Sequence, residues 1–346
     1  MGKIEYSNLD TLRSVAILTV LVDHLVPTLH AQFQFGSPLL LSFTGHIGQA
    51  GVLAFFVHTS IVLMMSLERM KQESSSVTWR FYIRRAFRIY PLAWVTMALA
   101  LTLGLPSNTW REPDPVSTQV ILSNVLLIQN IWTKKQIIQP LWSLAYEMQM
   151  YLVLPLLFGL VSLRRGLTWV ATLMAITSIG GYVLGLFTGG RLNMAAYLPC
   201  FIAGVWCYGA MKKFQPKVSS HFWLPIVLLI VFAYTWTHQA EPEPVFWQGW
   251  IFCAGLAALI PLVKNTDVLA IKTISHQIAK YSYGMYLLHV PVLYFVFRYL
   301  KVSNVALGAM LFFVVTTAVS VVAYHLIEEP LINWGRKVTT PKHQVT

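Results

Sequence analysis

The sequence predicts an all-α fold: a polytopic membrane protein with about ten transmembrane helices and with the N- and C-termini in the cytoplasm. Composition is the first reason. Of the 346 residues, 56% are hydrophobic and only 11% are charged, whereas a soluble domain carries about 25% charged residues. The mean hydropathy is +0.60. This composition excludes a soluble enzyme and a disordered chain. The other two reasons for the predicted fold are the lengths of the apolar segments and the distribution of the basic residues.

Ten apolar segments approach the length of about 20 residues that a spanning helix needs. They cover residues 12–30, 46–67, 89–105, 141–161, 167–187, 194–211, 222–238, 246–263, 281–300 and 305–327. A further run, 118–132, is short and contains several polar side chains, so we interpret it as an interfacial or re-entrant piece. We expect one membrane domain over residues 1–335 and a short basic cytoplasmic tail over residues 336–346.

The basic residues set the orientation of these segments. With the N-terminus in the cytoplasm, 18 lysines and arginines fall on the inner side and 6 on the outer side, with Arg13 left at the start of the first span. This asymmetry follows the positive-inside rule. A span at 118–132 would reverse all later loops and much of the bias. The net charge of +12 therefore reflects topology, and we expect no nucleic-acid partner.

The three cysteines give no sign of a metal site. Cys200, Cys207 and Cys253 all lie in apolar runs, at spacings that match no metal-ligand pattern. They also form no disulfide framework. We therefore expect neither a bound metal nor a permanently bound cofactor.

The first span carries two ionisable residues, which inside a membrane are by default a functional hypothesis. Arg13 and His24 are eleven residues apart, which is three turns plus roughly 20° and a rise of about 16 Å. They therefore share one face. An arginine at the surface and a histidine base near the midplane would suit acyl-coenzyme A, with phosphates at one end and a thioester at the other. Alternatively, Arg13 anchors the topology and His24 is a packing residue.

Two aspartates lie near these residues. Asp23 is adjacent to His24 but about 100° away around the helix, so we do not expect it to orient the imidazole directly. Asp10 is a reasonable N-cap for the first helix, or a partner of the arginine pair described next.

The cytoplasmic loop before the third span contains Arg85 and Arg88, which lie on one side of a helical turn. Guanidinium groups bind phosphate oxygens in bidentate fashion, so this pair is a candidate site for a phosphorylated ligand. The alternative is that these charges only stop translocation and attract anionic lipid.

The fourth span opens with Trp142, Glu147 and Tyr151. A carboxylate among aromatic rings suits a polyhydroxylated ligand, so we expect these residues to line an acceptor pocket on the outer side. The alternative is an interfacial aromatic belt, with Glu147 paired to Arg13 or to a lysine of the outer loop.

Several sequence blocks together resemble the acyltransferase type 3 family of integral-membrane O-acyltransferases. In chain order they are Leu9-Asp10-Thr11-Leu12-Arg13-Ser14-Val15-Ala16 followed by His24; Gly51-Val52-Leu53-Ala54-Phe55-Phe56-Val57; Arg84-Arg85-Ala86-Phe87-Arg88-Ile89-Tyr90-Pro91; Trp142-Ser143-Leu144 with Glu147; Tyr281-Ser282-Tyr283-Gly284-Met285-Tyr286-Leu287-Leu288-His289; and Glu328-Glu329-Pro330. Any one block is weak, but their order over nearly the whole chain is specific.

The resemblance implies transfer of an acyl group, usually acetyl, from acyl-coenzyme A at the cytoplasmic side to a hydroxyl of a glycan or other sugar-containing acceptor. It implies that Arg13 and His24 are required for activity. It also places Arg13, Arg85 and Arg88 at the donor, and Glu147 in a catalytic or acceptor-binding role. The enzyme would lie in the bacterial cytoplasmic (inner) membrane, in contact with membrane lipids.

The chain departs from the family pattern at two points. Thr11 stands where the family usually has glycine, and His58-Thr59-Ser60 replaces the usual Leu-Ser-Gly. His58 is therefore a candidate substrate-specificity residue or second base. Alternatively, a neighbouring helix simply satisfies its hydrogen bonds.

The sequence shows no esterase-like soluble domain. We expect the membrane domain either to act alone or to pass the acyl group to a separate extracytoplasmic protein. Two other functions remain open: a transporter or flippase for a lipid-linked glycan or small molecule, and a non-catalytic partner in polysaccharide assembly.

Overall fold

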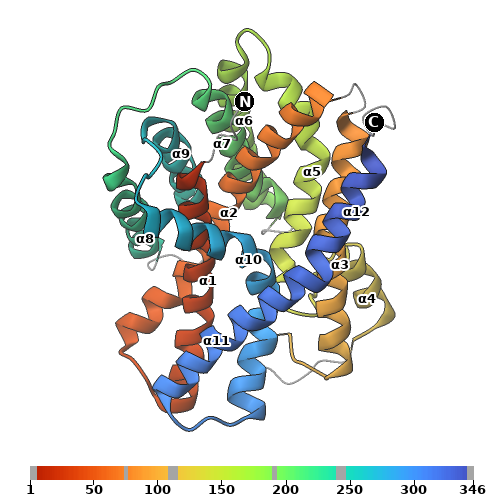
Figure 1. Cartoon of the computed structure of the whole chain (residues 1–346), viewed down its shortest axis with the longest axis vertical. Helices are drawn as coiled ribbons and strands as arrows, with labels where there is room; N and C mark the ends of the chain where they lie inside the picture. Colours follow the sequence, from red (N-terminus) through yellow and green to blue (C-terminus); the bar gives the residue numbers. More distant parts are fainter. Residues whose placement is uncertain (1–5, 74–76, 108–115, 189–192, 239–246, 341–346) are drawn as a thin grey trace. The chain divides into compact units, whose positions relative to one another are not determined.

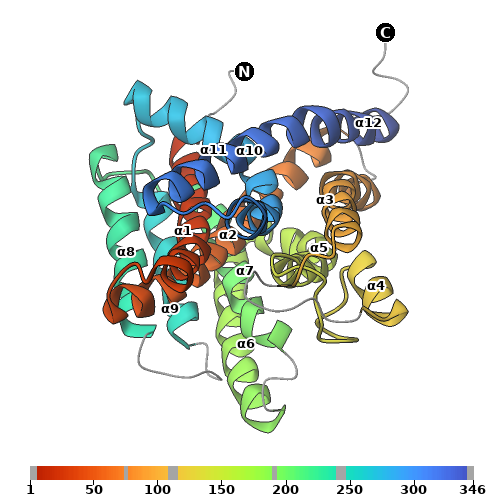
Figure 2. The same cartoon turned by 90° about the horizontal axis from the view of Figure 1, so that it is seen from below.

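The computed structural model describes residues 6–73, 77–107, 116–188, 193–238 and 247–340. Within these residues the fold is helical, and Figures 1 and 2 show its elements. The α-helices are α1 Ser7–Phe33, α2 Pro38–Glu73, α3 Val77–Thr102, α4 Thr118–Val125, α5 Leu141–Val161, α6 Gly166–Thr188, α7 Asn193–Met211, α8 Trp223–His238, α9 Trp247–Leu259, α10 Leu269–Leu293, α11 Val305–Ala323 and α12 Glu329–Thr339. Short π-helical turns cover Tyr294–Tyr299 and Tyr324–Glu328.

Each of the ten predicted segments overlaps a helix over most of its described length, which confirms the all-α membrane fold. Seven stretches of the described chain are helices long and apolar enough to cross a membrane. These are Ser7–Phe33, Pro38–Gln72, Leu141–Val161, Gly166–Leu184, Met194–Met211, Ser220–Thr237 and Val305–Thr339. The apolar stretch Trp247–Leu262 is shorter, while the N-terminal halves of α3 and α10 carry several arginines and lysines. The count of ten spans and the side of the termini stay predictions.

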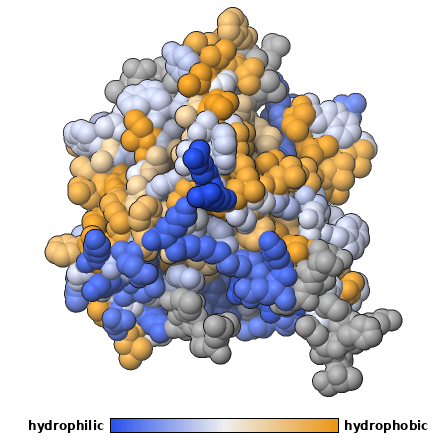
Figure 3. Space-filling model, turned by 90° about the horizontal axis from the view of Figure 1, so that it is seen from above, coloured by the Kyte–Doolittle hydropathy of each residue, from blue (hydrophilic) through white to orange (hydrophobic). Residues whose placement is uncertain are grey.

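The surface agrees with a membrane environment. Large apolar side chains are exposed, including Leu156 on α5, Phe187 on α6 and Leu326 after α11. Figure 3 shows apolar residues covering much of the face in view. Because single exposed leucines are common but wide apolar surfaces are not, this pattern indicates contact with lipid.

The run 118–132 forms the eight-residue helix α4 and a series of turns. Eight residues rise only about 12 Å, too little to cross a bilayer. The buried Asn124 side chain donates to the carbonyl oxygens of Val120 (2.8 Å) and Lys135 (2.9 Å). It also accepts from the backbone N–H of Ile137 (3.1 Å). The returning loop is therefore tied to α4, as expected for a non-spanning piece.

The described chain divides into two compact units, each of which is presented by itself. The first unit comprises Met1–Pro27, Gly36–Met65 and Val153–Ser282, and the second comprises Thr28–Phe35, Ser66–Leu152 and Tyr283–Thr346.

In the first unit, small residues allow α1 and α2 to approach closely. A Cβ added at Gly51 would lie 2.3 Å from Thr19 Oγ1 and 2.5 Å from the Ala16 carbonyl oxygen. A Cβ at Gly204 of α7 would lie 2.4 Å from the Val57 carbonyl oxygen. Small residues are the usual means by which membrane helices pack. The core around α1 and α2 is consequently tight.

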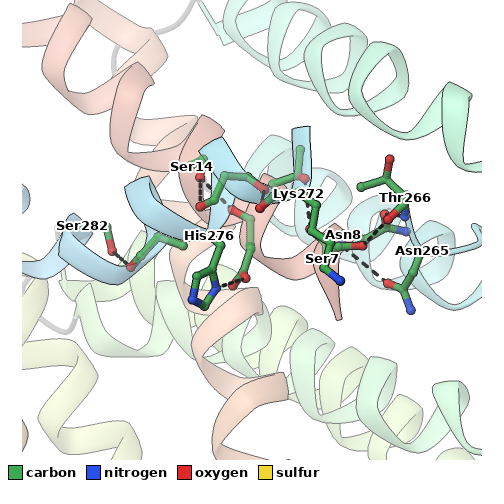
Figure 4. Close-up of polar contacts among 12 residues, drawn as sticks. Ser7, Asn8, Ser14, Asn265, Thr266, Lys272, His276 and Ser282 are labelled. Carbon is green, nitrogen blue, oxygen red and sulfur yellow. Dashed lines mark hydrogen bonds and ion pairs between the residues drawn. The ribbon is translucent and has the colours of Figure 1, made fainter. Parts of the chain in front are cut away.

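The start of α1 is held by a polar network within the same unit (Figure 4). The Asn8 amide donates to the Lys264 carbonyl oxygen (2.9 Å), and Asn8 Oδ1 accepts from the Thr266 N–H (3.2 Å). Ser14 Oγ donates to the Ser275 carbonyl oxygen of α10 (2.8 Å). Because these bonds satisfy buried polar groups, they fix the position of α1 against α10.

The N-cap prediction for Asp10 is wrong. The helix α1 already begins at Ser7, so Asp10 lies in its first turn. Its carboxylate Oδ2 is 2.9 Å from Nδ1 of His276 on α10. The acidic residue still favours the helix N-terminus electrostatically, but it does so from inside the helix.

In the second unit, α12 packs along α3. The Phe87 ring meets Trp334 edge to face at 4.9 Å between centroids, and Gly335 leaves no room for a side chain beside it. Arg84 Nε donates to Thr339 Oγ1 (2.8 Å). The first residues of the predicted tail, 336–339, are thus helical, whereas 341–346 lie outside the described residues.

Candidate functional site

Arg13 is held in a fixed orientation by α10 and α2. Its Nε donates to Ser282 Oγ (2.6 Å), and its guanidinium lies 6.0 Å from the centroid of the Phe55 ring. Ser282 is fully buried and its hydroxyl donates to the Ala279 carbonyl oxygen (2.8 Å). Because both neighbours are themselves packed, the guanidinium is pre-oriented. A fixed cation is suited to binding an anionic or polarised group.

The hydrogen bond of His24 assigns its tautomer. Its Nδ1 lies 3.0 Å from the Val20 carbonyl oxygen, which can only accept, so Nδ1 carries the hydrogen. In the neutral ring Nε2 is then the basic nitrogen. The side chain as a whole is 19% exposed, while Nε2 itself is buried. His24 therefore has the form that a general base requires.

The hydrogen bond that orients the His24 ring comes from Val20 and not from Asp23, as predicted, but the Asp23 carboxylate lies closer than its 100° offset suggests. Its Oδ2 lies 3.4 Å from His24 Nδ1, and its Oδ1 accepts from the backbone N–H of Gly48 on α2 (2.9 Å). The helical period fixes only the direction of each Cα–Cβ bond, and rotation about the side-chain bonds brings the two groups together. The carboxylate is therefore placed to act on the imidazole.

His58 lies on α2 in the same unit and is only 3% exposed. The positive charge of Arg13 acts on it electrostatically. Within the described part of the chain, its Nδ1 has no hydrogen-bond partner, and neither has the buried hydroxyl of Ser60. The alternative interpretation is that a neighbouring helix satisfies all hydrogen bonds of His58. That interpretation does not hold for Nδ1. A buried polar atom without a partner is costly, which keeps His58 a candidate binding residue.

In the second unit Arg85 belongs to a polar cluster with Glu147 and Tyr151. The Tyr151 hydroxyl donates to Glu147 Oε1, and both of these side chains act electrostatically on Arg85. The Arg85 Nε is buried and has no hydrogen-bond partner among the described residues. Glu147 and Arg85, which the sequence placed in separate sites, are thus brought into one cluster.

Burial lowers the pKa of the Arg85 guanidinium, and the charge of Arg88 acts in the same direction, while Tyr151 and Glu147 oppose the shift. An arginine nevertheless stays protonated in proteins. Arg85 is therefore a buried cation whose Nε has no hydrogen-bond partner among the described residues, although Glu147 acts on its charge.

Arg88 has a different environment. Its Nη1 lies 2.6 Å from Oε2 of Glu328, whose side chain is only 1% exposed. The guanidinium also lies 5.4 Å from the centroid of the Tyr283 ring. Glu328 ends the π-helical turn after α11, and such turns often occur at functional sites. The charge of Arg88 is consequently balanced within the protein, whereas that of Arg85 is balanced less directly.

Trp142 forms an aromatic pair at the start of α5. Its ring meets Tyr146 edge to face at 6.0 Å between centroids, while the neighbouring Ser143 Oγ is 2.7 Å from the Tyr286 hydroxyl. Aromatic rings beside hydroxyl groups are a combination that suits a sugar ligand.

The predicted residues therefore form two groups. Arg13, His24 and His58 belong to the first unit, and Arg85, Arg88, Trp142 and Glu147 belong to the second. Sequence reasoning missed the contacts of Asp23, Ser282 and Glu328 with the candidate residues His24, Arg13 and Arg88. Glu328 and Asp23 could have been found from the sequence, because each is a carboxylate in or beside an apolar run, where ionisable residues are often functional.

Comparison with known proteins decides the family. A family model described as an acyltransferase domain (Acyl_transf_3) matches residues 6–325. The chain belongs to the acyltransferase type 3 family. This membership favours an acyltransferase over the transporter and the non-catalytic partner.

The relatives include two O-acetyltransferases and one further acyltransferase. The chain is 24% identical to "O-acetyltransferase OatA" of Staphylococcus aureus (strain NCTC 8325 / PS 47), over 95% of this chain and 57% of that protein. It is 23% identical to "Putative peptidoglycan O-acetyltransferase YrhL" of Bacillus subtilis (strain 168), over 94% and 55%. It is 29% identical to "Acyltransferase MdmB" of Streptomyces mycarofaciens, over 83% and 78%. The chain thus spans little more than half the length of the two O-acetyltransferases. No solved structure matches it.

Proposed function

We propose that this membrane protein transfers an acyl group, in the simplest case acetyl, from acyl-coenzyme A at the cytoplasmic side to a hydroxyl of a glycan or other sugar-containing acceptor. The observation that carries the proposal is His24, whose Nδ1–H is bound to the Val20 carbonyl so that Nε2 is the base. The names of the relatives support acetyl as the group, and one of them supports peptidoglycan as an acceptor class.

In the proposed reaction His24 Nε2 removes the proton of the acceptor hydroxyl. The hydroxyl oxygen then forms a bond to the thioester carbonyl carbon, the carbon–sulfur bond breaks, and the coenzyme A thiolate takes the proton back from Nε2. The oriented guanidinium of Arg13 stabilises negative charge on the donor. The proposed transfer needs no metal and no permanently bound cofactor.

The remaining residues divide between donor and acceptor. Arg85 and Arg88 bind coenzyme A phosphates, with Arg85 contributing more because Glu328 already balances Arg88. Glu147, Trp142 and His58 contribute to acceptor binding, and Glu147 also to catalysis. The enzyme acts in the bacterial cytoplasmic (inner) membrane, and a separate extracytoplasmic protein completes transfer where the acceptor lies outside.

The test is acetyl-coenzyme A binding to detergent-purified protein. We expect saturable binding that Arg85→Ala weakens by at least about tenfold, that Arg88→Ala weakens less, and that His24→Ala leaves intact. Arg84→Ala is the matched control, because Arg84 donates to Thr339 within the protein. Titration calorimetry of the five proteins measures these affinities.

Two results would contradict the proposal. If a well-folded sample binds no donor at about 1 mM, the upper end of usual Michaelis constants, the coenzyme A donor is wrong. If binding is normal and Arg85→Ala binds like wild type, the donor site lies elsewhere.

A further inference from the structure

We propose that Asp23, fixed by the backbone N–H of Gly48, is a positioning residue for His24 that supports the imidazole when it takes up a proton. This inference rests on the proposed role of His24 as a base. The contacts that carry it lie between α1 and α2, within the first unit.

The geometry distinguishes this arrangement from a directly hydrogen-bonded Asp–His pair. The Nδ1–H of His24 already donates to the Val20 carbonyl at 3.0 Å, and Asp23 Oδ2 stands at 3.4 Å, beyond a strong hydrogen bond. The carbonyl therefore fixes the tautomer, and the carboxylate acts through its charge. When Nε2 takes up a proton, the ring becomes cationic, and a nearby anion in a poorly solvated site stabilises it.

The second contact of Asp23 explains why the carboxylate stays in place. Its Oδ1 accepts from the Gly48 N–H at 2.9 Å. A Cβ added at Gly48 would lie only 2.5 Å from Asp23 Cγ and 2.8 Å from Oδ2. Only glycine leaves the carboxylate room at this point of α2. By contrast, a Cβ at Gly45, one turn earlier, would meet nothing within 4 Å.

Among the described residues, two histidines act electrostatically on Asp23. His24 acts from its own helix and His46 from α2. His46 Nδ1 lies 2.7 Å from the Ser42 carbonyl oxygen, so this ring is also fixed. Both imidazoles thus act on the Asp23 carboxylate electrostatically, and His24 is the one on the helix that carries Arg13.

The first experiment measures His24 without an acceptor. Diethyl pyrocarbonate modifies a neutral imidazole at its basic nitrogen, and mass spectrometry gives the rate at His24 in purified protein at about pH 8. Because the carboxylate raises the electron density and order of the ring, Asp23→Asn should slow this modification by roughly threefold or more. Asp23→Glu should restore part of the rate.

The glycine pair supplies the matched control. Gly48→Ala should displace the carboxylate and slow modification of His24 as Asp23→Asn does, whereas Gly45→Ala should react like wild type. The double variant of Asp23→Asn and Gly48→Ala should be no slower than the slower single variant, because both act through one contact. Equal thermal midpoints in detergent show that the variants are folded.

The second experiment follows coenzyme A release from acetyl-coenzyme A with soluble peptidoglycan fragments as acceptor. Asp23→Asn should lower kcat by roughly tenfold to a hundredfold, with the Michaelis constant for acetyl-coenzyme A within about twofold of wild type. His24→Ala should remove activity.

The outcomes separate this inference from the proposed function. If His24→Ala retains activity, His24 is not the base and the proposed mechanism fails, even where Asp23 alters the reactivity of the ring. If Asp23→Asn leaves the modification rate of His24 at the wild-type value, the positioning role is wrong, whatever the activity of His24→Ala.

Discussion

At the scale of single residues, the proposed function depends on how side chains are held as well as on which ones are present. Arg13 shows this most clearly, because its Nε is occupied by Ser282 Oγ at 2.6 Å. The remaining guanidinium nitrogens then point in a defined direction. A pre-oriented group loses less entropy on binding. Ser282 should therefore affect substrate affinity although it need not touch the substrate.

Replacement of Ser282 by alanine tests this directly. Loss of one charge-assisted hydrogen bond corresponds to about 1–3 kcal/mol, so we expect Ser282→Ala to raise the Michaelis constant for acetyl-coenzyme A by at least about fivefold. Steady-state release of coenzyme A gives this constant. Ser275→Ala is the control, because Ser275 is buried on the same helix but accepts from Ser14 through its backbone carbonyl. If both variants raise the Michaelis constant equally, the cause is the loss of any buried hydroxyl from α10. The proposed positioning of Arg13 by Ser282 would then be wrong.

At the scale of helices, the close approach of α1 and α2 sets the spacing of the proposed site residues on these two helices. Arg13, His24 and Asp23 lie on one helix and His58 on the other, so their spacing depends on how closely the backbones pack. A Cβ added at Gly51 would lie 2.5 Å from the Ala16 carbonyl oxygen. Because a backbone carbonyl cannot rotate away as a side chain can, the helices would have to separate.

The substitution Gly51→Ala should accordingly destabilise the protein by about 1–3 kcal/mol, the usual cost of overpacking. Gly255→Ala on α9 is the matched control, since a Cβ there meets nothing within 4 Å, and alanine favours the helix by up to about 1 kcal/mol. Thermal unfolding in detergent should show a lower midpoint for the first variant and an unchanged or higher one for the second. A midpoint equal to wild type in Gly51→Ala would show that the α1–α2 contact is adjustable.

The helices themselves were predictable, but several contacts between them were not. Apolar length located every predicted segment on a helix, and the period of α1 drew attention to Arg13 and His24. The pairing of Arg88 with Glu328 joins residues 240 positions apart, and no local pattern carries such information. The contact of Asp23 with His24 depends on side-chain rotation, which helical geometry leaves open.

At the scale of the whole molecule, the unresolved prediction is the path through the membrane. The positive-inside bias predicts that the loop containing Lys135 lies outside and that Lys213 lies in the cytoplasm. Both residues are exposed. The side on which these two lysines lie depends on the short helix α4, because a span there would place Lys135 inside and Lys213 outside. The eight residues of α4 and its tied return loop argue against such a span.

Labelling in intact bacterial cells tests this path. We expect Lys135→Cys to react with a membrane-impermeant maleimide in intact cells, and Lys213→Cys to react only after permeabilisation. The natural thiols Cys200, Cys207 and Cys253 are buried, so the unaltered chain should show little labelling and serves as the control. The reverse pattern would mean that residues 118–132 cross the membrane. The loop after α7 would then lie outside, on the side opposite to a donor that arrives from the cytoplasm. Arg85 and Arg88 precede this run, so their predicted position at the inner face would not change.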